Sequence, residues 1–317
     1  PESPYADWYT FEEFPDNYKS WWGFYTLPAV DKSNKVYRHY LLNPENAQNS
    51  FVSKPIEPAK KRSLEVLGYV FCAVVSLCIL APIASFLIMV FETKYPIDPT
   101  FTLYHIEKTI NRGADGYLLN SLLYSVLVAV FGTLVAFVCA YLTTRMQGRF
   151  GKVLHLFSIT SMAIPGIVLG LSYLLFFNGT PIYGTIWIIV LVNSIHFFAS
   201  PYLMMRNTLE KMNPNLEAVG QSLGVGRLHI IWDVILPKVK LTVFEMLVYF
   251  FVNSMMTISA VSFLAPPAPK PLALMINQFE AQRLMESAAF VSLVIFFANI
   301  LVKVVMQLIR KFSADEE

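Results

Sequence analysis

Six long runs of apolar residues constrain the fold of this chain more than any other feature. A helix that crosses about 30 Å of hydrocarbon at about 1.5 Å per residue needs roughly 20 apolar residues. The runs cover residues 64–91, 118–142, 153–177, 185–204, 241–264 and 287–309. Residues 122–130 are apolar on every face, unlike barrel strands, which alternate in polarity over about ten residues. The sequence therefore predicts an all-α membrane protein with six transmembrane helices.

The composition agrees with a membrane protein. Hydrophobic residues make up 55% of the chain and charged residues 15%, whereas a soluble domain carries about 25% charged residues. The net charge of +2 is too small to indicate nucleic acid as a partner. We expect an N-terminal extension or linker over residues 1–60, a membrane domain over 61–312, and a short tail over 313–317.

The Lys and Arg residues that flank the runs predict the orientation, because cytoplasmic flanks carry the excess. One set of flanks holds thirteen of them: Lys60, Lys61, Arg62, Arg145, Arg149, Lys152, Arg206, Lys211, Arg227, Lys238, Lys240, Arg310 and Lys311. The opposite flanks hold five: Lys94, Lys108, Arg112, Lys270 and Arg283. Both termini, and the segment between the fourth and fifth runs, are therefore expected in the cytoplasm.

The first 60 residues are rich in aromatic and acidic side chains and do not form a signal peptide. Two interpretations remain. The segment is a cytoplasmic linker within a longer product, or it is an independent extension that covers a partner. The chain starts at Pro1 and not at Met, which favours the linker.

A polar, helix-forming segment separates the fourth and fifth runs. Asn213 is a plausible helix cap, Pro214 suits the first helical position, and Glu217 suits the first turn. Residues 224–226, Gly-Val-Gly, then interrupt the helix. A second helix follows over 227–235, with one face formed by Leu228, Ile231, Trp232 and Ile235. Such a pair either docks on a partner or lies on the membrane surface as an amphipathic connector.

This segment resembles the coupling loop of ATP-binding-cassette importer permeases, written Glu-Ala-Ala, three residues, Gly, nine residues, Ile, any residue, Leu-Pro. Gly224 and residues 234–237, Val-Ile-Leu-Pro, keep that register, with Val234 in place of Ile. Glu217 lies one residue early, which rotates a helical side chain by about 100°. The ATPase-coupling residues that the resemblance implies are Glu217, Ala218, Gly220, Gly224, Val234, Leu236 and Pro237.

Other parts of residues 64–311 are similar to the same family. They include 120–123 (Asn-Ser-Leu-Leu), 140–145 and 163–170. Residues 101–105 and 257–264 look like the branch that imports ferric iron or 2-aminoethylphosphonate, some members of which carry two six-span halves on one chain. Polyamine and thiamine permeases are also similar.

The resemblance implies a permease subunit of an ATP-driven importer in the bacterial inner membrane. Its expected partners are a cytoplasmic ATPase dimer, a second permease half on the same or another chain, and an extracytoplasmic substrate-binding protein. ATP and Mg²⁺ would bind to the ATPase, because this chain lacks a Gly-x-x-x-x-Gly-Lys-Ser/Thr run. No catalytic residues, cofactor or metal site of its own are expected. The alternatives are an ion-gradient-driven secondary transporter and a structural membrane subunit, although the runs lack a central acidic residue.

Polar residues inside the fifth run are candidates for the translocation path. Asn253 and Thr257 are four residues apart and share a helical face, with Ser254 alongside. They either line the path or form hydrogen bonds between helices, as polar residues in membranes commonly do. Asn193 and His196 in the fourth run are interpreted as packing residues.

Overall fold

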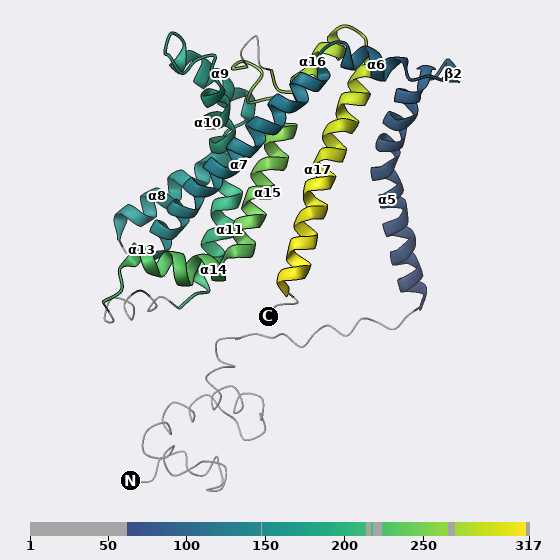
Figure 1. Ribbon diagram of the computed structural model, residues 1–317. Coiled ribbons are helices and arrows are strands. Elements are labelled where there is room, and N and C mark those ends of the chain that lie inside the picture. Colours follow the sequence, from purple (N-terminus) through teal and green to yellow (C-terminus); the bar gives the residue numbers. More distant parts are fainter. Residues whose placement is uncertain (1–61, 147, 214–216, 218–223, 266–269, 315–317) are drawn as a thin grey trace, which may run out of the picture. The chain divides into compact units, whose positions relative to one another are not determined.

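The computed structural model describes residues 62–146, 148–213, 217, 224–265 and 270–314 (Figure 1). The expected extension over 1–60, the prolines at 266–269 and the last residues, 315–317, lie outside the described residues. The chain divides into two compact units, residues 1–74 and 75–317. Residues 313 and 314, which were expected in the tail, belong to the last helix.

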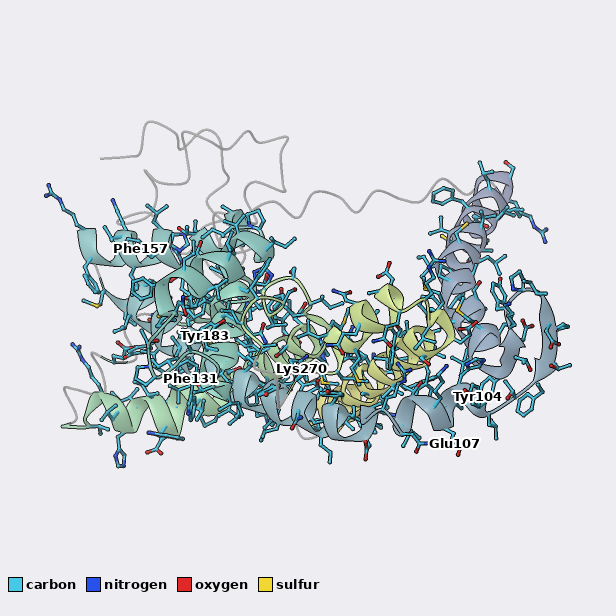
Figure 2. The ribbon with its side chains drawn as sticks, turned by 90° about the horizontal axis from the view of Figure 1, so that it is seen from above. Tyr104, Glu107, Phe131, Phe157, Tyr183 and Lys270 are labelled. Carbon is cyan, nitrogen blue, oxygen red and sulfur yellow. The ribbon has the colours of Figure 1, made fainter. Side chains whose placement is uncertain are left out.

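A long helix, α5 (Arg62–Phe91), begins the described chain. An antiparallel hairpin of β1 (Glu92–Lys94) and β2 (Asp98–Phe101) follows, and then the short helix α6 (Tyr104–Ile110). The rings of Phe91 and Phe101 stack at 5.6 Å and hold the base of the hairpin. Tyr104 and Glu107 lie on the exposed face of α6 (Figure 2).

The longest helix, α7 (Ala114–Arg145), forms the centre of the bundle and packs mainly against α15, α11 and α10. Its buried face carries small side chains at helical spacing: Ser121, Ser125, Ala129, Gly132, Ala136 and Ala140. Small residues let membrane helices approach closely. A Cβ on Gly132 would lie 2.8 Å from the buried Phe250 ring of α15, so glycine is required at this crossing.

The third predicted span is a bent pair and not one straight helix. Helix α8 (Arg149–Thr160) and the 3₁₀ turn η3 (Ser161–Ala163) meet α9 (Gly166–Phe177) at 110°. Ile164 has an extended backbone at φ −100° and ψ 117°. The cause is Pro165, because a residue before proline is disfavoured in the helical region.

The fourth predicted span is also bent, by 55°, between α10 (Ile186–His196) and α11 (Ala199–Glu210). The break falls at Phe197 and Phe198. Pro201 explains it, because proline has no N–H to bond the carbonyl of Phe197 four residues earlier.

The chain then continues through α13 (Arg227–Ile230), a π-helical turn η4 (Ile231–Ile235) and α14 (Leu236–Lys238) into α15 (Lys240–Met256). The fifth span was expected to run to residue 264, but its helix ends at Met256. Thr257 is extended at φ −72° and ψ 124°, and its hydroxyl donates to the carbonyl of Asn253 at 2.6 Å. Residues 259–264 form turns. The bundle is completed by α16 (Ala273–Ala281) and α17 (Met285–Ala314).

The prediction of a helical membrane protein is confirmed. Within the described residues, three helices are long and apolar enough to cross a membrane, and the two bent pairs raise the number to as many as five. Helix α15, at the position of the fifth predicted span, has 17 residues.

The segment from α13 to α14 lies at the same end of the second unit as the C-terminal end of α17, whereas α6 and α16 lie at the opposite end (Figure 1). The main core lies between α7, α11, α15, α16 and α17. The outer surface of the helices exposes many large apolar side chains. Phe157 of α8 is one of them (Figure 2).

Candidate coupling and translocation sites

The segment that resembles a coupling loop contains a glycine with a left-handed backbone. Gly224 has φ +78°, a conformation that side chains with a Cβ rarely adopt, and open space surrounds its Cβ position. Gly226 is extended at ψ 149° and leads directly into α13. Residues 224–226, the expected glycine hinge, therefore form an irregular turn that leads into α13.

Two isoleucines hold the helices after this turn. Ile230 and Ile235 are buried, whereas Leu228 and Trp232 are 75% and 67% exposed. The prediction that Leu228, Ile231, Trp232 and Ile235 form one apolar face is therefore wrong. The π-helical turn is the reason, because its i to i+5 hydrogen bonding brings residues five apart onto one side. Leu228 and Trp232 are thus exposed large apolar side chains on the described part of this segment.

The remaining sequence-derived coupling residues differ in position. Val234 is half-buried and packs against the main core. Leu236 is half-buried, and Pro237 is exposed and directly follows the π-helical turn and Leu236. The Glu217 carboxylate lies 2.9 Å from Arg145 Nε at the end of α7. Ala218 and Gly220 lie outside the described residues.

A polar network that sequence reasoning missed joins three helices near the same end. His155 Nδ1 of α8 lies 2.7 Å from the Tyr202 hydroxyl of α11, which donates to Thr143 Oγ1 of α7 at 3.0 Å. Arg206 contacts His155 and pairs with Glu210 at 2.8 Å. Only the Arg206–Glu210 pair, four residues apart, has a signal in the sequence, because the other partners lie on different helices.

Two of the three predicted path residues line a small pocket at the crossing of α7, α10 and α15. Asn193 Nδ2 donates to Ser254 Oγ at 3.2 Å, and Asn193 is 2% exposed. The pocket is lined by Ser121, Tyr124, Ile189, Asn193, Ser254, Thr257, Val261 and Pro271. Asn193, which was interpreted as a packing residue, therefore joins the predicted Ser254 and Thr257.

Asn253 differs from its two neighbours. Its amide Nδ2 donates to the Tyr249 carbonyl of its own helix at 2.7 Å, and its side chain is absent from the pocket lining. The predicted role of Asn253 in the path stays a prediction. The Thr257 hydroxyl donates to the backbone carbonyl of Asn253 at 2.6 Å.

Irregular backbone from three elements meets beside His196. A Cβ on Gly166 would lie 2.5 Å from Ser259 Oγ and 3.0 Å from His196 Nε2. The bends at residues 164–165 and 197–198 and the turns after α15 therefore pack together. Within the described residues, no three His, Cys, Asp or Glu side chains gather closely enough to hold a metal ion.

Residues 130–313 match a protein family described as binding-protein-dependent transport system inner membrane component. The chain is 30% identical over 180 residues to the ferric transport system permease protein FbpB of Actinobacillus pleuropneumoniae, covering 55% of this chain and 26% of that protein. It is also 24% identical over 141 residues to a homologue of the spermidine/putrescine transport system permease protein PotC from Mycoplasma genitalium, covering 43% and 50%. The chain thus spans at most about half the length of these curated relatives.

A solved structure shares the fold. It is the crystal structure of a bacterial ABC transporter involved in the import of the acidic polysaccharide alginate, with a TM-score of 0.63, 16% sequence identity, and coverage of 79% of this chain and 99% of that one. The family match covers more than half of the present chain and includes the coupling-loop residues and α7 from residue 130 onward. The chain therefore belongs to the family of binding-protein-dependent transport system inner membrane components.

Proposed function

We propose that this chain forms one half of the translocation path of an ATP-driven, binding-protein-dependent importer. In this proposal a cytoplasmic ATPase dimer binds residues 213–237, here called the coupling segment. ATP and Mg²⁺ bind to the ATPase, and this chain contributes no catalytic group. The coupling segment transmits closure of the ATPase as a rigid-body movement of the helices.

One observation carries the proposal. The coupling segment leaves Leu228 and Trp232 exposed while Ile230 and Ile235 fix it to the main core. A tryptophan exposed on an anchored helix is typical of the centre of a protein interface. Because α14 continues into α15, a force on this surface reaches a helix that lines the pocket.

The complete importer would also contain a second permease half and an extracytoplasmic substrate-binding protein. Likeness to ABC importer structures supports these partners. The exposed apolar residues along α7, such as Leu123 and Val130, provide surface for the second half or for lipid.

Ferric iron is the substrate that the relatives favour, because the FbpB match is a ferric transport permease. 2-Aminoethylphosphonate and thiamine remain alternatives from the sequence resemblance. A polyamine is the second candidate, supported by the PotC homologue. Competition for uptake of radioactive ferric iron by unlabelled iron, spermidine and 2-aminoethylphosphonate in intact cells distinguishes these substrates.

The coupling role is tested by Gly224→Val in the assembled importer. Valine is strained at φ +78°, so the turn into α13 must change. We expect substrate uptake per ATP hydrolysed to fall about fivefold or more, a size typical of altered coupling between sites. The measurement is uptake and phosphate release in reconstituted vesicles.

The matched control is Gly179→Val. Gly179 has the same φ of +78° and the same open space around its Cβ position, but it follows α9 and lies outside the coupling segment. It is expected to retain normal coupling. Normal uptake by Gly224→Val, or an equal loss in both variants, would contradict the coupling role.

A further inference from the structure

The ion pair between Glu217 and Arg145 joins the coupling segment to the end of α7. Arg145 is the last residue of α7, where a positive charge also suits the carbonyl end of the helix. Its Nε lies 2.9 Å from Glu217 Oε1. Pairs of this kind cannot be found from sequence spacing, because the partners lie on separate elements.

The pair is enclosed within this one chain. The side chains of Arg145 and Glu217 are 10% and 14% exposed. The Tyr141 phenol, one turn earlier on α7, also interacts with the Glu217 carboxylate, and Arg227 at the start of α13 lies near that phenol. The Glu217 carboxylate is therefore mostly buried against its own chain and leaves little surface for another protein.

We propose that Glu217 is a positioning residue that fastens the coupling segment to the end of α7, and that it does not itself contact the ATPase. This inference rests on the proposed coupling function and assigns the contact with the ATPase to the exposed Leu228 and Trp232. The displacement of Glu217 by one residue from the family register agrees with this role, since it rotates a helical side chain by about 100°.

The consequence concerns the route by which movement enters the bundle. The backbone connects the coupling segment to α11 on one side and to α15 on the other. The ion pair adds a third attachment, to α7, which packs against α10, α11 and α15. A movement of the coupling segment thus reaches the central helix directly, and the Thr143–Tyr202–His155 network passes it from α7 to α8 and α11.

Charge reversal in the assembled importer tests the pair. Glu217→Arg and Arg145→Glu each place two like charges together, and we expect each to lower uptake per ATP hydrolysed roughly tenfold. The double variant Glu217→Arg/Arg145→Glu restores opposite charges and should recover most of the lost coupling. ATPase co-purification and thermal stability are measured for every variant. If a charge-reversed variant does not fold, the milder single variants Glu217→Gln and Arg145→Gln take its place.

The matched control is Glu245→Gln. Glu245 lies 3.7 Å from Arg310 at the same end of the bundle, but this pair is more exposed and does not involve the coupling segment. We expect unchanged coupling.

Three results would overturn the inference: normal coupling in Arg145→Gln, loss of ATPase binding in Glu217→Gln alone, or no recovery in the double variant. Failure of the proposed function is separate, because it would appear as an absence of ATP-dependent uptake in the unaltered importer.

Discussion

Close contacts at single glycines hold the irregular parts of this bundle together. A Cβ on Gly170 of α9 would lie 2.5 Å from the backbone carbonyl oxygen of Ala260, and a backbone oxygen cannot rotate away. Gly166 packs against the same turn, at the Ser259 side chain. Gly170 is needed because two backbones touch, and Gly166 because side chains lie against it, and not because of an unusual φ.

Gly170→Ala should therefore lower the free energy of unfolding by about 2 kcal/mol, the usual cost of overpacking. Reversible unfolding of the purified protein in mixed detergent measures it. Gly116→Ala is the control, because Gly116 lies in α7 with open space at its Cβ position. Since alanine favours a helix by about 1 kcal/mol over glycine, that variant should be equally or more stable. Equal effects in the two variants would contradict the proposed contact.

Bends and early helix ends shape the elements more than apolar length does. Pro165 and Pro201 account for two breaks, and both are visible in the sequence. Helix α15 ends at Met256, where the Thr257 hydroxyl donates to the carbonyl of Asn253, whereas the apolar run continued to residue 264 and predicted a longer helix. Between elements, the Asn193–Ser254 hydrogen bond joins α10 to α15. The predicted role of Ser254 and Thr257 in the path stays a prediction.

A double-mutant cycle with Asn193→Ala and Ser254→Ala measures that hydrogen bond. Hydrogen bonds between membrane helices contribute about 0.6 kcal/mol on average, so we expect an interaction energy near this value. The same cycle with Asn253→Ala in place of Ser254→Ala is the control, because Asn253 bonds within its own helix. Additive effects of Asn193→Ala and Ser254→Ala would show that the helices do not interact through these side chains.

For the whole molecule, the orientation in the membrane is a prediction from charge. The end that carries the coupling segment also carries Arg145, Lys152 and Arg310, in agreement with a cytoplasmic location. The hairpin of β1 and β2 would then face outward. The matched region covers 26% of the ferric permease relative, so the present bundle corresponds to part of that protein's length.

Labelling of single cysteines tests this orientation. With Cys72, Cys78 and Cys139 replaced by alanine, Ile97→Cys between β1 and β2 should react with a membrane-impermeant maleimide in intact spheroplasts. Lys152→Cys, exposed at the start of α8, should react only after permeabilisation. The reverse pattern would place the coupling segment outside the cell and exclude contact with a cytoplasmic ATPase.

The sequence alone determined that this protein is a helical membrane protein, where most helices lie, and which segment resembles a coupling loop. These properties depend on local apolar length, proline and glycine positions, and short motifs. Only the tertiary structure decided that Glu217 meets Arg145, that Asn193 joins Ser254, and that Ile230 and Ile235 face the core. The reason is physical: such contacts depend on how separate helices cross, and a single π-helical turn or proline bend changes which side chains meet.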